Sequence, residues 1–330
     1  MRPLEFGWFL PTAGDTEAYG RSAQEVPAGP DMFERVVTAA EEAGFEYMLV
    51  PVQTVCWEAW ITSAMMIGRS KKIKLLVAAR PGYINPVLMA KMISTFDQLS
   101  GGRISINLIA GQSEKENTGE GIPWPKETRY EMMEEEVTIL KTIWAAKGPV
   151  DFDGKFYKLN RAQIRPYPLQ QPWPKFYLGG GSGQAWELSA KHGREDKIGF
   201  GMRLQIICRE TEAEAWEAAR GLVGGVSDKH QQMIKTHFAT SVANARMQKL
   251  GEQDLIEPHL WTGLTKVRPG AGVAVVGNPA HVAGVLQNFI DLGCHSFCLS
   301  GYLHDEEARR FGRWVRPILL ERNKGRMPAA

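Results

Sequence analysis

Two arginines in this sequence stand where a guanidinium group would meet an anion. Arg203 interrupts the apolar run 200–207, in which an unpaired charge would be costly to bury. Arg268 lies in the glycine-rich segment 267–272, which could carry it onto the same ligand. A guanidinium binds a carboxylate, phosphate or sulfonate through two parallel hydrogen bonds. The pair therefore predicts an anion site. The plainer alternatives are a core carboxylate beside Arg203 and a solvent-exposed Arg268.

A glycine loop at 179–183 joins a short apolar run to an expected helix. The backbone N–H groups of Gly180 and Gly181, the Ser182 hydroxyl and the helix N-terminus could together bind a phosphate. Tyr130, at the start of an earlier helix, could add a second contact. A tight turn and a half-buried tyrosine are the alternatives. The loop lacks GxGxxG spacing and there is no Walker sequence, which argues against dinucleotide and P-loop sites.

Further polar side chains follow the ends of expected strands. Cys56 comes after the second strand, Asn107 lies in the fourth, and Tyr302 and His304 follow the last. No histidine adjoins Cys56 in the sequence, so a packing role is its alternative. The four cysteines and seven histidines show no CxxC, zinc-knuckle or HExxH spacing. We therefore expect reduced thiols and no metal site.

The elements that must position these residues alternate between apolar runs of strand length and longer segments of helical period. We expect strands over 4–10, 46–52, 73–79, 103–109, 175–178, 200–208 and 296–300, and helices over 31–43, 57–68, 86–99, 129–146, 184–191, 212–222 and from 306 onward. This alternation predicts an α/β fold, a (β/α)8 TIM barrel forming a single domain over 1–330. In such barrels, ligand chemistry sits at the carboxyl ends of the strands.

Three stretches depart from the barrel rhythm. An Asp-Gly turn between aromatic residues predicts a hairpin within an insertion at 147–174, and the polar segment 224–269 predicts an excursion that serves as a lid. One βα unit is missing near 192–199, a segment too short for a strand and a helix. Either the unit is deleted or a stretch is absent from the sequence. We favour absence, because a deleted strand would expose two parallel edges.

Charge and hydropathy exclude some partners. Lys plus Arg number 39 and Asp plus Glu number 37, a formal net charge of +2, so no general attraction to nucleic acid or anionic lipid is expected. No apolar run approaches the about 18 residues that span a bilayer, and no signal peptide is visible. A cytoplasmic protein is expected.

Several motifs occur in order from the first strand to the last helix. They are WFLPT at 8–12, LSGGR at 99–103, FGMRL at 200–204, VRPGAG at 267–272 and SGY at 300–302. Together they resemble the bacterial alkanesulfonate monooxygenases, which belong to the luciferase-like flavin monooxygenases. The resemblance implies that reduced FMN, supplied by a separate NAD(P)H-dependent flavin reductase, and dioxygen cleave a carbon–sulfur bond to give sulfite and an aldehyde. It also implies a homo-oligomer, a dimer or tetramer.

The resemblance assigns roles position by position. It places Cys56 beside the reacting flavin, Asn107 and Tyr302 on the substrate, and Arg203 and Arg268 on the sulfonate, with Arg268 assisting proton transfer. The remaining implied contacts are Trp8, Gln205 and His304 to the substrate, and Tyr130, Gly180, Gly181, Ser182 and Asn107 to FMN.

Two departures from the family bear on the substrate. The family has histidine where this chain has Ala13 and Gln205. Their loss leaves room and neutral hydrogen-bonding capacity, which favours a sugar sulfonate such as sulfoquinovose. The other interpretations are a deazaflavin- or FMN-dependent oxidoreductase acting on another substrate, and a flavin-binding barrel without catalysis.

Overall fold

A ten-stranded sheet forms the centre of the molecule, in the order β11-β12-β13-β10-β14-β1-β4-β5-β6-β9. The computed structural model describes residues 2–111, 113–146, 148–192, 198–237, 242–268, 270 and 272–326. Seven parallel pairings link eight strands, from β13 to β9. These are β1 (Glu5–Phe9), β4 (Tyr47–Val50), β5 (Lys74–Ala79), β6 (Ile104–Ile109), β9 (Phe176–Gly179), β10 (Gly201–Cys208), β13 (Ala274–Gly277) and β14 (Ser296–Ser300).

All seven strands expected from the sequence are present, and the eighth parallel strand, β13, was missed. Its residues follow the predicted lid, and an apolar run at 273–276 with an Asn-Pro helix start after it was the available signal. Two short strands, β12 (Leu260–Trp261) and β11 (Leu255–Glu257), extend the sheet beyond β13 in antiparallel fashion.

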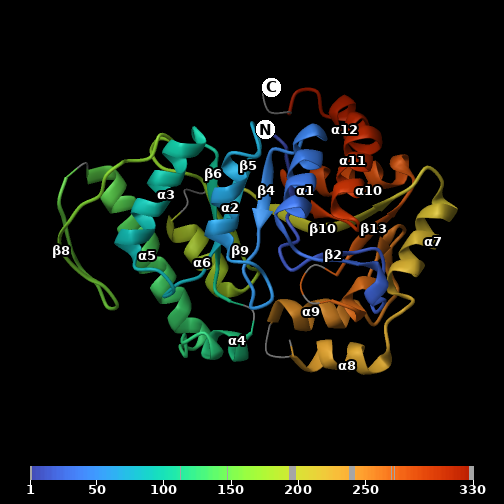
Figure 1. The fold of residues 1–330 in the computed structure, drawn as a ribbon, viewed down its shortest axis with the longest axis horizontal. Coiled ribbons are helices and arrows are strands. Elements are labelled where there is room, and N and C mark those ends of the chain that lie inside the picture. The colour runs from blue at the N-terminus through green and yellow to red at the C-terminus, as the bar shows by residue number, and fades with distance from the viewer. Residues whose placement is uncertain are drawn as a thin grey trace.

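Helices flank the sheet, with α3 and α5 on one side and α7 and α10 to α12 on the other (Figure 1). The helices that follow the parallel strands are α1 (Pro30–Glu42), α2 (Ala59–Ile67), α3 (Pro86–Ser100), α5 (Lys126–Ala146), α6 (Gly183–His192), α7 (Glu212–Val223), α10 (Pro279–Asp291), α11 (His304–Arg310) and α12 (Arg316–Arg322). Local signals set their ends. Asn85 and Asn278 cap α3 and α10 just before a proline, and Gly101 ends α3 at a φ of 67°. A π-helical turn, Phe311–Val315, separates α11 from α12.

The ring of strands is not closed by hydrogen bonds between the described residues, because β9 forms one end of the sheet. Side chains reach across the interior instead: Lys175 Nζ and the Tyr177 hydroxyl both donate to Glu5 Oε1 on β1, at 2.7 and 2.8 Å. The missing βα unit maps between α6 and β10. Residues 193–197 of that segment lie outside the described residues, and the expectation that a stretch is absent there stays a prediction.

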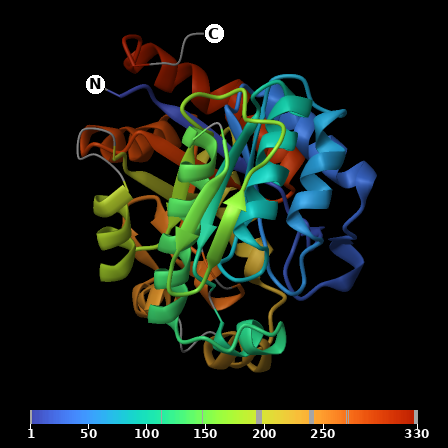
Figure 2. The ribbon, with the colours of Figure 1, turned by 90° about the vertical axis from the view of Figure 1, so that its left-hand side faces the viewer.

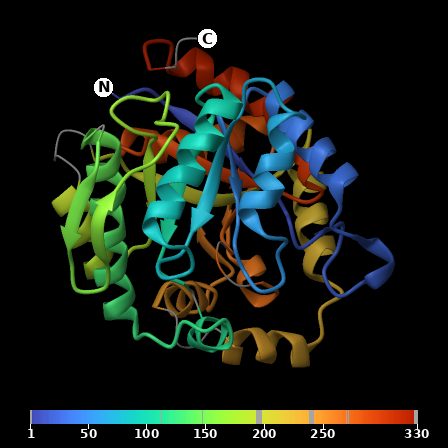
Figure 3. The ribbon, with the colours of Figure 1, turned by 60° about the vertical axis from the view of Figure 1, so that its left-hand side comes forward.

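The two insertions have structure of their own. The expected hairpin is formed by β7 (Val150–Asp153) and β8 (Lys158–Ala162), which lie in front in Figure 2 beside α5. The excursion after α7 contains α8 (Asp228–His237), α9 (Val242–Leu250), β11, β12 and a 3-10 turn at Gly263–Lys266. Figures 1 and 3 place α8 at the same end as α4 (Glu114–Gly119), which follows β6, and opposite α12. No helix of the described residues combines the length and apolarity needed to cross a membrane.

Candidate active site

Tyr302, just past β14, meets Arg268 from the excursion. Arg268 Nη1 donates to the Tyr302 hydroxyl oxygen at 2.7 Å, and the Tyr19 hydroxyl donates to the same oxygen at 2.6 Å. Because Tyr302 accepts both bonds, its own proton remains available for another acceptor. Burial works to lower the pKa of Arg268, but the neighbouring hydroxyls of Tyr302 and Tyr19 outweigh it and raise that pKa, so the guanidinium stays charged.

Arg203 projects from β10 over the Phe9 ring, with its guanidinium carbon 4.3 Å from the ring centroid. Its Nη1 donates to the Ser300 hydroxyl at 3.0 Å and more weakly to the Cys298 carbonyl at 3.4 Å. Burial lowers its pKa, Cys298 offsets part of that effect, and the positive charge of Arg268 lowers it further. The two guanidinium groups are therefore close enough to repel each other.

Neither arginine has a carboxylate partner among the residues that the structure describes. Arg80, just after β5, is an example of a buried arginine that is neutralised by carboxylates. It is buried and forms ion pairs with Glu120 at 2.5 Å and Glu116 at 3.5 Å. Arg203 and Arg268 instead form hydrogen bonds to neutral groups. The described residues therefore place no carboxylate beside Arg203, which was the structural alternative for this residue.

Gln205 lies on the same side of β10 as Arg203 but is completely buried. The Ser300 hydroxyl, which accepts from Arg203, donates to Gln205 Oε1 at 2.6 Å. The expectation that Gln205 contacts substrate and opens space does not match this position. Gln205 orients Ser300, and through it Arg203.

Cys56 is half-buried in the loop after β4. Burial raises the pKa of its thiol; the Thr12 hydroxyl and the charge of Arg268 counteract this, and the Glu116 carboxylate adds to it. A raised pKa keeps the thiol protonated, so nothing activates Cys56 as a nucleophile. Its electrostatic link to Arg268 places it within the same group of side chains.

The glycine loop and Tyr130 come together as expected. Ser182 Oγ donates to the Tyr130 hydroxyl at 3.4 Å, and a Cβ at Gly180 would lie 3.1 Å from that hydroxyl oxygen. Ser182 also accepts from the backbone N–H of Ala185 at 3.4 Å as α6 begins. An addition that sequence analysis missed is Arg246 on α9, whose Nη1 donates to the Gly181 carbonyl at 3.0 Å.

Asn107 lies on β6 next to Gly179, the first residue of the glycine loop. It is half-buried on β6, and a Cβ at Gly179 would lie 3.5 Å from its Oδ1. Among the described residues, no hydrogen bond involves its side-chain amide. The amide is thus available to a ligand lying between the glycine loop and the arginines.

Two predicted substrate contacts lie elsewhere. Trp8 is fully buried and packs on Phe45 in the helical layer, with Nε1 donating to the His304 carbonyl at 3.1 Å. A strand exposes alternate residues to opposite faces, so Phe9 faces the interior and Trp8 does not. His304 is also buried, and Asp15 holds it through Nδ1 at 2.9 Å and the backbone N–H at 2.8 Å. The His304 imidazole packs against the side chains of Tyr302 and Phe9.

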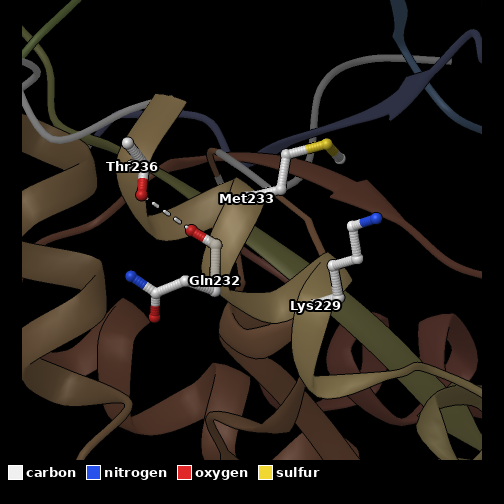
Figure 4. A pocket seen from close by; sticks show the side chains of 4 residues that line it. All are labelled: Lys229, Gln232, Met233 and Thr236. Carbon is white, nitrogen blue, oxygen red and sulfur yellow. Dashed lines mark hydrogen bonds between the residues drawn. The ribbon is translucent and has the colours of Figure 1, made fainter.

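Two surface hollows do not include the arginine pair. One, of about 470 Å³, is lined by Lys229, Gln232, Met233 and Thr236 of α8, with Thr236 donating to the Gln232 carbonyl (Figure 4). The other, of about 310 Å³, lies between α7 and α11, and Tyr302 is on its wall. Two of its lining arginines, Arg209 and Arg310, bond to the buried Glu307, and Arg310 also pairs with Glu306 of the lining.

Parallel βα units with cationic and tyrosyl groups near the strand ends, beside a glycine loop, define a fold of the TIM-barrel type, in which ligands bind at the carboxyl ends of the strands. The family model described as "luciferase-like monooxygenase" matches residues 4–195, and the chain belongs to this family. It is accordingly a flavin-dependent monooxygenase. The fold is of the TIM-barrel type found in that family.

Solved structures show the same fold at low sequence identity. A long-chain alkane monooxygenase is 17% identical with a TM-score of 0.78, covering 100% of this chain and 93% of that one. The EDTA monooxygenase from Chelativorans sp. BNC1 is 17% identical with a TM-score of 0.76, covering 99% and 95%. The oxygenating constituent of 3,6-diketocamphane monooxygenase from Pseudomonas putida, solved with FMN, is 16% identical with a TM-score of 0.65, covering 99% and 100%.

Proposed function

We propose that this chain is the oxygenating component of a two-component FMN-dependent monooxygenase that cleaves the carbon–sulfur bond of an organosulfonate. The observation that carries the proposal is the pair Arg203 and Arg268, two half-buried guanidinium groups without a carboxylate partner among the described residues. A bound sulfonate would neutralise both charges and relieve their repulsion. The available Tyr302 proton offers a third contact to a sulfonate oxygen.

The residues of the glycine loop fit the phosphate of FMN. Tyr130 and Ser182 supply hydroxyl groups, Gly180 and Gly181 allow close approach of the backbone, and Arg246 supplies positive charge. Asn107 lies beside Gly179, where this loop begins. When bound, reduced flavin supplies the two electrons that the reaction with dioxygen requires.

The overall reaction balances with reduced flavin and dioxygen as co-reactants. A primary sulfonate, dioxygen and the reduced flavin give an aldehyde, hydrogen sulfite, water and oxidised flavin. One oxygen atom enters the aldehyde and the other enters water. Arg203 and Arg268 hold the sulfur-bearing end, and Arg268 with Tyr302 can hold or donate the proton that a leaving sulfite needs. A separate NAD(P)H-dependent flavin reductase would supply reduced FMN.

Sulfite release tests the proposal. Purified protein is mixed with a flavin reductase, NAD(P)H, FMN, air and a panel of sulfonates that runs from short alkanesulfonates to sulfoquinovose. We expect sulfite from at least one sulfonate, and the space left by Ala13 is the remaining reason to expect that a sugar sulfonate is accepted. Flavin binding with no sulfite from any sulfonate would contradict the substrate class. Hydride transfer from a reduced deazaflavin without consumption of dioxygen would instead establish the second interpretation.

A further inference from the structure

Three side chains outside the proposed active site converge although they are distant in sequence. Glu212 opens α7, His259 lies in the turn between β11 and β12, and His281 lies in the first turn of α10. One ligand atom from each lies within 4.8 Å of the other two. Sequence spacing could not reveal this cluster, because only the pairing of β12 and β10 with β13 brings the three elements together.

The geometry points to a Zn²⁺ site, and we propose that Glu212, His259 and His281 bind one zinc ion. His259 Nδ1 lies 3.9 Å and His281 Nδ1 lies 3.7 Å from the Glu212 carboxylate oxygens. Zinc bonds of about 2.0–2.2 Å in a tetrahedron hold ligand atoms roughly 3.4 Å apart. Movements of a few tenths of an ångström would close the distances, but the two imidazole planes are stacked and do not converge on one point. At least one ring therefore has to turn out of the stack for both Nδ1 atoms to bind the same ion.

The surroundings support a site that is held open for these rings. A Cβ at Gly277 would lie 2.8 Å from His281 Cβ and 3.3 Å from His259 Nδ1, so only glycine leaves room there. His259 has a φ of 67°, which residues other than glycine adopt infrequently and which occurs often at binding sites. His281 Nδ1 is buried and has no hydrogen-bond partner among the described residues.

The ligand set selects the metal. Two imidazoles and one carboxylate suit zinc, and they do not suit Ca²⁺ or Mg²⁺, which take oxygen ligands. Glu212 and the two histidines are at least partly exposed, so water can complete the tetrahedron. Two contributions weaken binding. His259 Nδ1 donates to the Val276 carbonyl at 3.0 Å, so zinc has to displace the Nδ1 proton and break this hydrogen bond. Both helices also direct their positive N-terminal ends at the site.

A bound zinc ion would fix the β11–β12 hairpin to α7 and α10. The chain runs from this hairpin through the 3-10 turn at Gly263–Lys266 directly to Arg268. The ion would therefore stabilise the base of the segment that carries Arg268, without contacting substrate. Its role is structural.

The test is a calorimetric titration of chelator-treated protein with Zn²⁺, together with thermal unfolding. We expect one ion per chain and a higher Tm with zinc. H259A, H281A and E212Q should each weaken zinc affinity by at least about tenfold, whereas the control E217Q, an exposed residue of the same helix, should not. The exposed position of Glu212 makes E212Q a variant that keeps its fold, which circular dichroism would verify.

Substitution with Co²⁺ identifies the ligands independently. The absorption spectrum should show a tetrahedral or five-coordinate ion without a thiolate charge-transfer band, because no cysteine belongs to the cluster. Absence of one-to-one binding in the unmodified protein would overturn the proposal. So would equal affinity in all variants, or a thiolate band, either of which would place the metal elsewhere. None of these outcomes depends on the sulfonate chemistry.

Discussion

Arg246 and Gly181, which are 65 positions apart, are joined by a hydrogen bond of 3.0 Å from the arginine Nη1 to the glycine carbonyl. The bond connects α9, in the excursion, to the loop that we assign to the FMN phosphate. The backbone carbonyl is a weak partner for a full charge. A phosphate held by Tyr130 and Ser182 would attract the guanidinium more strongly.

Replacing Arg246 with alanine should therefore weaken the binding of FMN more than the binding of riboflavin, which has no phosphate. We expect the Kd for FMN to rise about threefold to tenfold, since the contact is exposed, and the Kd for riboflavin to stay unchanged. Quenching of flavin fluorescence measures both. Lys249→Ala, which removes an exposed charge from the same helix, is the control. Equal loss for both flavins would mean that Arg246 only supports the loop.

Replacing Arg203 with alanine should separate catalysis from flavin binding. Loss of a charge-assisted contact to the sulfonate should lower kcat/KM for sulfite release by about 10- to 100-fold or more. FMN affinity should change little, because the FMN phosphate is assigned to the glycine loop and not to β10. Parallel assays of sulfite and fluorescence test this. A matching fall in flavin affinity would remove Arg203 from the sulfonate site.

The fold could be predicted further than the site. Seven parallel strands follow from apolar runs alone, because a strand buried in a barrel has to be apolar along its length. The β13 strand was missed, since its apolar run of only four residues is short and follows the predicted lid. The face of the sheet to which each side chain points was harder to predict than the strands themselves. Trp8 and Phe9 are adjacent aromatic residues, and only their contacts, Phe9 with Arg203 and Trp8 with Phe45, show that Phe9 faces the interior.

Several contacts between elements distant in sequence could not be predicted. The bond from Arg246 to Gly181 and the one from Tyr19 to Tyr302 require the excursion and the first βα loop to fold over the strand ends. Gln205 shows the same limit. The resemblance assigned it to the substrate, whereas in the structure it is buried and accepts a hydrogen bond from Ser300.

Removal of the Tyr302 hydroxyl should impair turnover more than removal of the Tyr19 hydroxyl. Tyr302→Phe deletes the acceptor of Arg268 and the available proton, so we expect kcat to fall about 10- to 100-fold. Tyr19→Phe keeps the Arg268 bond intact and should cost less than tenfold. Steady-state sulfite release from both variants gives the order. A more damaging Tyr19→Phe would show that Tyr19 and not Tyr302 acts on the substrate.

Glu136 makes stability depend on pH. It is buried on α5, where its Oε1 accepts from the Gly82 N–H at 2.8 Å and from the Tyr157 hydroxyl at 2.6 Å. Burial raises its pKa to about 7, against the partial opposition of these hydrogen bonds, from an ordinary value of 4.5. A folded-state pKa above the unfolded value favours the protonated, neutral form. The stabilisation is complete below about pH 4.5 and is lost as the pH rises towards 7 and above.

The shift corresponds to about 3 kcal/mol of unfolding free energy across that interval. Urea unfolding at pH 5 and pH 8 should show a decline of this order attributable to Glu136. Glu136→Gln retains an oxygen that can accept both hydrogen bonds but cannot ionise, so the same pair of measurements on this variant should show a smaller decline. Glu131→Gln, an exposed position on the same helix, controls for general charge effects. If Glu136→Gln and the unmodified protein lose equal stability between pH 5 and pH 8, the burial of Glu136 does not set the pH dependence.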